Sequence, residues 1–220
     1  ALQMLESGSL VVPWPHVSKR DCSVAVASGL DPRQVLALRA RWCGLFDTVD
    51  SYRELVAKLL LDNCRQNRAL NSALQAFNSK LDETFPPFEE NDLRGINLSG
   101  ISFDQGINLR NIDLSFSELS LARLSYSYLY GSKFLGAQGF QVELQDAVCQ
   151  KADFSFASLP NLDATGTEFT GAVFRNANLH SSNLDGTSLQ RCDLRGANLS
   201  HCSLQPLPSS PTRVRPIHVD

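Results

Sequence analysis

Residues 172–204 read AVFRN ANLHS SNLDG TSLQR CDLRG ANLSH CSL, with a Leu or Phe at the third place of every group of five. The same spacing runs back to Asn91. From residue 109 to residue 204, seventeen of the twenty positions spaced five apart are Leu or Phe, and Leu93, Leu98 and Phe103 continue the series with one extra residue near Gly106. A period of five matches neither the helical 3.6 nor the strand 2.0, so the stretch is an internal repeat.

A second column of small residues accompanies the first. Two positions before each central Leu or Phe stands mostly Ala, Ser, Thr or Cys, for example Ala177, Ser182 and Cys192. In a solenoid the large side chain would fill the axis and the small one would let the corner turn tightly. Burying twenty Leu or Phe side chains at about 1.5–3 kcal/mol each gives tens of kcal/mol, opposed by chain entropy. Such a core can stand alone if its ends are capped.

The repeats fit a known pattern. Segments 177–181 (ANLHS), 192–196 (CDLRG) and 197–201 (ANLSH) follow A(D/N)LXX, and in this the chain resembles the pentapeptide-repeat family. The resemblance covers just over half the chain. It implies a mainly β fold, a right-handed quadrilateral β-helix in which four repeats make one coil. It does not imply one function, because similar proteins include DNA mimics that bind DNA gyrase, type III effectors, cyanobacterial regulators and thylakoid-lumen proteins.

Four regions follow one another along the chain. Residues 1–30 lack helical periodicity and are predicted to form an extended N-terminal arm; residues 31–88 form an α-helical cap region, residues 89–205 the β-helix, and residues 206–220 a Pro-rich tail. Asp31 before Pro32 predicts a helix that reaches Gly44. A second helix is expected from Ser51 to about Glu83, either continuous or broken near Asn67. The helical region either caps the open end of the solenoid or forms a separate interaction domain.

The net charge of −3 is unevenly distributed. Residues 89–205 carry thirteen Asp or Glu against eight Lys or Arg, whereas residues 1–88 carry nine against ten and the tail adds +1. An acidic rod whose basic residues do not share one face argues against direct nucleic-acid binding. No apolar run approaches the length of a membrane span, and nothing resembles a signal peptide. Ala1 leaves a removed leader open, so the compartment is unassigned, with a processed organellar location such as plastid or thylakoid lumen as one option.

The sequence predicts no enzyme, no cofactor and no metal site. It contains no P-loop, no GxGxxG after a strand, no GxSxG and no HExxH. His180 and His201 are expected to be neighbours in successive coils, but two His without a carboxylate do not complete a zinc site. The cysteines are expected to be reduced structural thiols: Cys22, Cys43, Cys64, Cys149, Cys192 and Cys202.

Two surfaces are candidates for binding a protein partner. Residues twenty apart share one side of the solenoid, and one side is expected to be acidic through Asp104, Glu143, Asp146, Asp163 and Asp185. The other candidate is an outward cluster of apolar and aromatic residues in the second to fourth coils, which either binds a partner or is covered by the arm or the tail. Its members are Phe116, Leu121, Tyr126, Tyr128, Tyr130, Leu135, Phe140 and Phe156.

These features predict a non-enzymatic structural or adaptor protein. Its rigid β-helical scaffold would mediate protein–protein interaction as a subunit or accessory factor of a larger assembly. The alternative is a DNA mimic that binds and modulates a type II topoisomerase, DNA gyrase, through the acidic side. The modest charge of the rod, the aromatic cluster and the Pro-rich tail favour the first hypothesis. Neither hypothesis involves a cofactor or a transmembrane segment.

Overall fold

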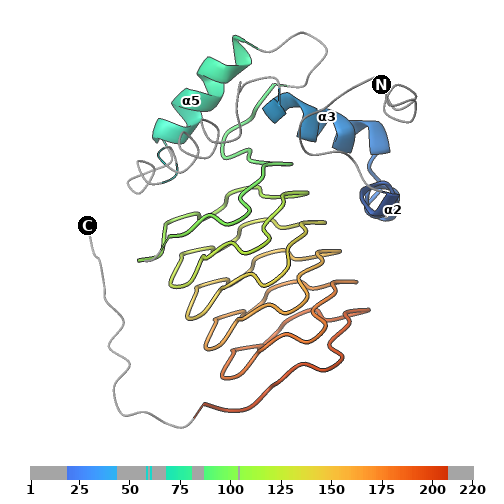
Figure 1. Cartoon of the computed structure of the whole chain (residues 1–220), viewed down its shortest axis with the longest axis vertical. Helices are drawn as coiled ribbons and strands as arrows, with labels where there is room; N and C mark the ends of the chain where they lie inside the picture. Colours follow the sequence, from blue (N-terminus) through green and yellow to red (C-terminus); the bar gives the residue numbers. More distant parts are fainter. Residues whose placement is uncertain are drawn as a thin grey trace.

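The structure is a computed structural model that describes residues 19–43, 58, 60, 68–80, 87–103 and 105–207. The described residues form three helices, α2 (Lys19–Ala27), α3 (Pro32–Cys43) and α5 (Arg68–Asn78), followed by a solenoid of stacked coils. The helices lie at and beside the first coil, and the later coils extend away from them (Figure 1). None of these described helices is long and apolar enough to cross a membrane.

Parallel β-bridges of a single residue hold each coil to the next. They fall in four columns, one for each side of the coil, and pair residues 92, 97, 102 and 108 with residues 113, 118, 123 and 128. The spacing is 21 in the first three columns and 20 from Asn108 onward, which confirms the extra residue predicted near Gly106. The mainly β expectation needs one correction, because the described residues form no strand longer than one bridge. A side of five residues that includes a turn leaves no room for a longer one.

A tight turn closes each repeat. The N–H of the small residue donates to the carbonyl of the central residue three positions earlier, as from Ala122 to Leu119 at 2.9 Å. The residue two after the centre has positive φ, for example 67° at Gly131. This is the geometry of a type II turn, in which Gly is the least costly residue at that place. Leu121 and Tyr126 occupy the same place with φ of 60° and 64°.

The predicted core is confirmed. The central Leu and Phe residues of the first four coils point inward and are buried, and the small residues beside them are buried as well. Three aromatic rings stack along the axis through successive coils: Phe134, Phe154 and Phe174 lie with centroids 4.6 and 5.0 Å apart and nearly parallel planes. Phe169 meets Phe154 edge-on at 5.8 Å. Burial decreases in the last coil, where Leu189, Leu194 and Leu199 are only half-buried.

Helix α3 begins as predicted. Asp31 caps α3, since its Oδ1 accepts a hydrogen bond from the N–H of Arg33 at 2.9 Å, and Pro32 is the first helical residue. Of the second predicted helix, the structure describes α5 and two further helical residues, Lys58 and Leu60. The expected break near Asn67 lies outside the described residues.

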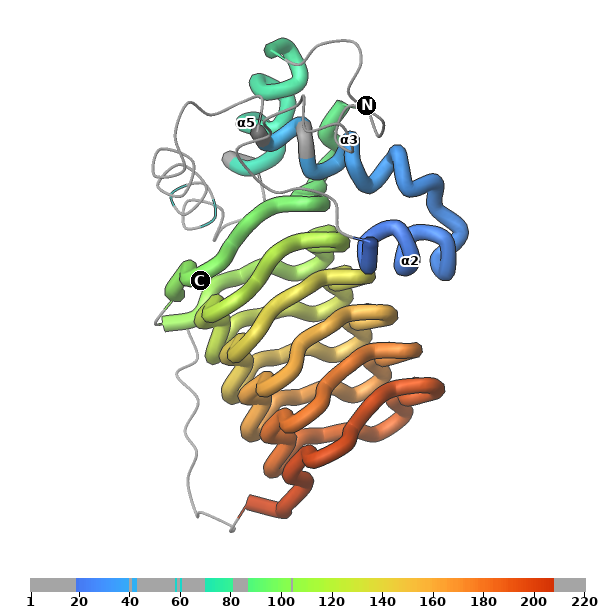
Figure 2. Tube along the Cα trace, turned by 45° about the vertical axis from the view of Figure 1, so that its right-hand side comes forward, coloured from blue at the N-terminus to red at the C-terminus, as the bar shows by residue number. Residues whose placement is uncertain are grey.

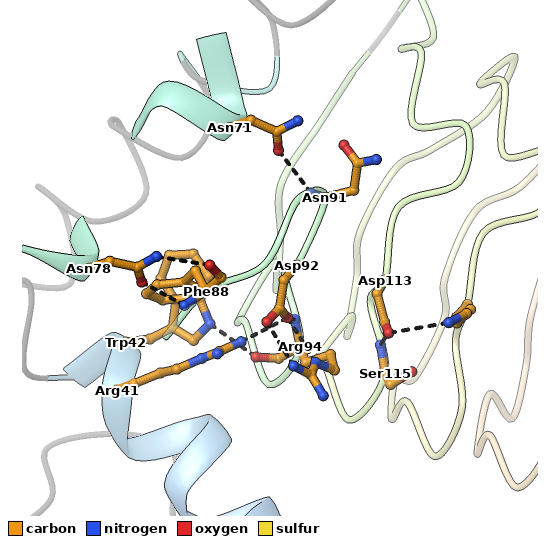
Figure 3. Close-up of polar contacts among 11 residues, drawn as sticks. Arg41, Trp42, Asn71, Asn78, Phe88, Asn91, Asp92, Arg94, Asp113 and Ser115 are labelled. Atoms are coloured by element: carbon orange, nitrogen blue, oxygen red, sulfur yellow. Dashed lines mark hydrogen bonds and ion pairs between the residues drawn. The ribbon is translucent and has the colours of Figure 1, made fainter. Parts of the chain in front are cut away.

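Residues of α3 and α5 pack onto the first coil (Figure 3). The Trp42 ring meets Phe88 edge-on at 4.7 Å, and its Nε1 donates to the carbonyl of Arg94 at 3.0 Å. The Asn78 side chain donates to the carbonyl of Phe88 at 2.8 Å and accepts from its N–H at 2.5 Å. Leu70, Leu74 and Phe77 of α5 belong, with Trp42, to the same continuous core as the solenoid. These residues therefore cover part of the first coil.

A buried ion pair joins α3 to the first coil. Arg41 Nη2 donates to Asp92 Oδ1 at 2.8 Å, and both side chains are almost completely buried. Arg94 pairs with the other carboxylate oxygen at 2.8 Å, and the Arg41 guanidinium lies 3.9 Å above the Phe88 ring. Burial raises the pKa of Asp92, but the hydrogen bonds and charges of Arg94 and Arg41 outweigh it, so this pKa is lowered overall.

The prediction of an extended arm over residues 1–30 is wrong for residues 19–27, which form α2. This helix lies beside the upper coils, and not over the open end (Figure 2). Val24 and Ala25 pack with Phe116 and Leu135 in a second, smaller core. Asp21 accepts a hydrogen bond from Gln138 Nε2 at 2.5 Å and pairs with Arg39 at 3.2 Å. Helix α2 is short and has no strong hydrophobic periodicity of its own, so packing on the solenoid stabilises it. Residues 1–18 lie outside the described part of the chain.

Candidate protein-binding surface

One side of the solenoid, here called the Glu143 face, carries a groove of about 540 Å³. The bridge column of this side is Ser102, Arg123, Glu143, Asp163, Asn183 and Ser203. Arg123, Glu143 and Asp163 line the groove from this column, while Leu121 and Gln141 line it from the neighbouring row of turn residues. The coil stacking thus builds one continuous surface from residues twenty apart.

Three large apolar side chains are exposed on or beside the Glu143 face. Leu121 is 56% exposed, Tyr126 is 49% exposed and Phe140 is 47% exposed. Leu121 and Tyr126 stand at the two turns that bound this side of their coil. Phe140 adjoins Leu121, since its carbonyl accepts the N–H of Leu121 at 2.8 Å. Apolar side chains gathered around a groove are typical of an interaction surface.

Two of these side chains also occupy a costly backbone conformation. Positive φ is uncommon for bulky residues and costs about 1–2 kcal/mol relative to the right-handed region. Some other coils place Gly or Asn at the equivalent turns, as at Asn161 and Gly166, while others place Gln, Asp, Ser or His there. Within the described chain, Leu121 and Tyr126 therefore have an unfavourable backbone conformation and also remain exposed.

The predicted acidic residues share this face, but neighbouring groups already contact several of them. Glu143 pairs with Arg123 at 3.5 Å, where both side chains are largely exposed. Asp163 accepts hydrogen bonds from Gln145 Nε2 at 2.6 Å and from Thr165 Oγ1 at 2.7 Å.

Asp185 and Asp146 extend the acidic surface along the same side of the solenoid. Asp185 accepts from Ser203 Oγ and from the N–H of Gln205, and these hydrogen bonds lower its pKa. Asp146 lies at the turn one coil below Tyr126. Asp104, the remaining predicted carboxylate, lies outside the described residues.

The residues of the predicted apolar cluster do not all lie on one exposed surface. Phe116 was expected to face outward, but it is buried under α2 and α3, and Leu135 is half-buried in the same small core. The physical reason is Gly136, the next turn in the same row. A Cβ there would lie 2.9 Å from the Phe116 ring and 2.8 Å from Val24, so only Gly lets the ring and the helix lie this close.

The other members of the predicted cluster stand on different sides. Tyr128 lies under the guanidinium of Arg110 at 4.9 Å, and Tyr130 lies under the ammonium of Lys151 at 5.4 Å. Both tyrosines and Phe156 are half-buried. Only Leu121, Tyr126 and Phe140 remain together on an exposed surface.

Several groove residues were not predicted from the sequence. Gln141 and Asn161 line the groove at turns twenty and forty residues after Leu121. They are polar and unremarkable in isolation, so composition does not single them out. The twenty-residue spacing would have placed them beside Leu121, had it been applied to the turn positions as well as to the outward columns.

The solenoid contains a fully buried cysteine and a pair of neighbouring histidines. Cys149 is fully buried, and burial raises the pKa of its thiol far above the usual range. The predicted neighbours His180 and His201 do meet, with ring centroids 5.2 Å apart, and His180 Nδ1 lies 2.8 Å from Ser200 Oγ. No group of three or more His, Cys, Asp or Glu among the described residues is arranged to hold a metal ion.

Comparison with solved structures finds pentapeptide-repeat proteins. HetL, which is involved in heterocyst differentiation regulation in the cyanobacterium Nostoc sp. strain PCC 7120, is 22% identical over 51% of this chain and 53% of its own, with a TM-score of 0.44. QnrB1, a plasmid-mediated fluoroquinolone resistance protein, is 18% identical over 51% and 76%, with a TM-score of 0.30. A protein of the Arabidopsis thaliana thylakoid lumen is 25% identical over 56% and 77%, with a TM-score of 0.23.

Family and curated-sequence comparisons give a narrower result. No curated protein sequence matches this chain. The family model described as pentapeptide repeats matches eight copies, over residues 141–176 and 172–205. The bridges and turns of the structure carry the same five-residue unit back to the first coil at Asp92. The chain therefore contains a pentapeptide-repeat solenoid, with the family's repeats matched over residues 141–205.

Proposed function

We propose that this chain is a non-enzymatic scaffold that binds a protein partner through the Glu143 face, as a subunit or accessory factor of a larger assembly. One observation carries the proposal: three large apolar side chains are exposed beside a groove, and two of them occupy a backbone conformation that favours Gly or Asn. A partner that covers Leu121 and Tyr126 would gain about 25 cal/mol for each Å² of apolar surface removed from water.

The solenoid supports such a role because it is stiff. Its backbone hydrogen bonds join every coil to the next, and its core is continuous with the cap. A right-handed sense of the coil, which the family resemblance implies, is part of this proposal. The binding surface is narrower than the sequence predicted, since Phe116 and Leu135 are covered by α2.

A double substitution separates binding from folding. Leu121→Asn with Tyr126→Asn removes the apolar surface and places at both turns a residue that tolerates positive φ. The free energy of unfolding should stay unchanged or rise by up to about 1 kcal/mol, while affinity for the partner should fall by about 30-fold or more. Urea unfolding measures the first, and calorimetry with the partner identified by co-purification measures the second.

The matched control is His201→Asn, at the same row of turns but two coils beyond the groove, with φ of 61°. This variant should keep both stability and affinity. If the double variant binds the partner as well as the native chain does, the Glu143 face is not the binding surface. If it loses stability instead, the two side chains have a structural role.

The second candidate function is modulation of DNA gyrase through the acidic residues of the same face. Glu143, Asp163 and Asp185 recur at intervals of about one coil along one side of the solenoid. This candidate predicts that Asp163→Lys with Asp185→Lys abolishes an effect on DNA supercoiling, whereas Leu121→Asn with Tyr126→Asn leaves it in place. A supercoiling assay without any effect of the native chain would exclude it.

A further inference from the structure

We infer that the C-terminal tail of this chain, residues 208–220, docks in the groove of the Glu143 face and competes there with the partner. Competition with a partner rests on the proposed function, whereas the docking itself is a property of this chain. The exit point of the tail, the charges of the tail and of the groove, and the length of the tail all favour this docking.

The described chain leaves the solenoid on the Glu143 side. After the last central residue, Leu204, the N–H of Gln205 donates to Asp185 Oδ1 at 2.6 Å. Leu207 then lies against the turn at Gly186, where a Cβ would clash with its side chain. Gly186 belongs to the row of turns that contains Gly106 and Tyr126 and forms one border of the Glu143 face. These contacts therefore direct the chain toward this side at its last described residue.

The charges of the groove and of the tail are opposite. Glu143, Asp163, Asp146 and Asp185 provide four carboxylates on this side, against the single guanidinium of Arg123, for a net charge of −3 from these five groups. The tail that follows reads PSSPTRVRPIHVD. Arg213 and Arg215 carry positive charge, and Asp220 at its end carries negative charge. Exposed complementary charges of this kind steer and orient an approaching segment.

The tail also carries apolar side chains, which could contact the exposed apolar residues of the Glu143 face. Arg213 and Arg215 flank Val214, so two charged side chains and one aliphatic side chain lie close together along the tail. Ile217 follows Pro216 and would be free to contact Leu121 or Tyr126. Arginine flanked by aliphatic residues thus matches a groove that is lined by Glu143, Asp163 and Leu121.

The tail is long enough for this contact. Pro208, Pro211 and Pro216 favour an extended conformation of about 3.1 Å per residue. Six residues separate Leu207 from Arg213, which gives a reach of about 19 Å. Coils are stacked about 4.8 Å apart, and Glu143 lies two coils above Asn183, which shares a coil with Gly186. Both Glu143 and Asp163 are therefore within reach of Arg213.

Zero-length cross-linking of the full chain tests this docking. The variant Arg213→Lys with Arg215→Lys keeps both charges and supplies amines, which a carbodiimide joins only to carboxylates in direct contact. We expect peptides that link the tail to Glu143 or Asp163, in the monomer and at a yield that does not change with protein concentration. The pair Lys133–Asp113 on the solenoid, 3.9 Å apart and accessible, is the internal positive control.

A matched variant removes the acceptor carboxylates and keeps the fold. Adding Glu143→Gln with Asp163→Asn should remove the tail cross-links at positions 143 and 163, because a carbodiimide activates carboxylates and not the amides that replace them. Asn183 occupies the next place in this column and accepts the N–H of Asp185 through its side chain, so Asn fits this geometry. The Lys133–Asp113 cross-link should be unaffected.

Three results would overturn the inference. They are the absence of tail cross-links in a sample where the Lys133–Asp113 cross-link forms, tail cross-links that avoid Glu143 and Asp163, and cross-links confined to dimers, which would make a second copy the occupant. None of these results bears on whether a separate partner binds at Leu121 and Tyr126, so the docking and the proposed function can fail independently.

Discussion

Replacing Asp92 with alanine is expected to lower the free energy of unfolding by about 3–5 kcal/mol, because it leaves the buried guanidinium of Arg41 without its counter-ion. Asp92 is only 2% exposed and Arg41 is fully buried. Two other nitrogens of Arg41, Nε and Nη1, are buried and find no hydrogen-bond partner among the described residues. Asp92 is therefore the group that compensates this charge. Urea unfolding at pH 7 measures the loss.

Two further measurements distinguish this mechanism from a general loss of packing. Arg41→Met combined with Asp92→Ala removes both buried charges, so the double variant should be more stable than Asp92→Ala alone. If the double variant is the less stable of the two, the unpaired charge is not the cause.

The stabilisation by Asp92 should also depend on pH. Its pKa in the folded protein is lowered, so its contribution is complete above the unfolded-state value of about 3.9 and disappears as pH falls through the lower folded-state value. The difference in unfolding free energy between the native chain and Asp92→Ala should narrow below about pH 4. A difference that is the same at pH 3 and pH 7 would contradict the assignment.

Replacing Phe154 with alanine is expected to cost about 3–5 kcal/mol, because it opens a cavity on the axis of the solenoid. The Phe154 ring is 1% exposed and contacts three other rings: Phe134 at 4.6 Å, Phe174 at 5.0 Å and Phe169 at 5.8 Å between centroids. The backbone bridges on either side hold the coil spacing fixed, so the neighbours have little freedom to close the gap. Thermal or urea unfolding followed by circular dichroism measures the cost.

Phe154→Leu is the matched control, because Leu is the commonest residue at the centre of these repeats. It should cost clearly less than the alanine substitution, about 1–2 kcal/mol, since most of the volume is kept. Equal costs for the two variants would show that ring stacking, and not the filled volume, provides the stability.

The solenoid was predictable because each of its features repeats in the sequence. The central Leu and Phe positions, the small residues two before them and the extra residue near Gly106 all appear in the structure where the five-residue period places them. The capped start of α3 was predictable for a local reason, the pair Asp31–Pro32. The candidate surface was predictable only in part: Leu121, Tyr126 and Phe140 are exposed together, whereas Phe116 is covered.

The coil follows from the sequence alone, since every turn and every inward position is set by residues within one repeat or its neighbour. Which outward residues stay exposed depends instead on where α2 lies in the folded chain. The helix has no strong periodicity of its own, and its place is set by contacts with residues about ninety or more positions later in the chain, Phe116, Gly136 and Gln138. Such contacts leave no local pattern, so the covered and uncovered parts of the apolar cluster look alike until the chain is folded.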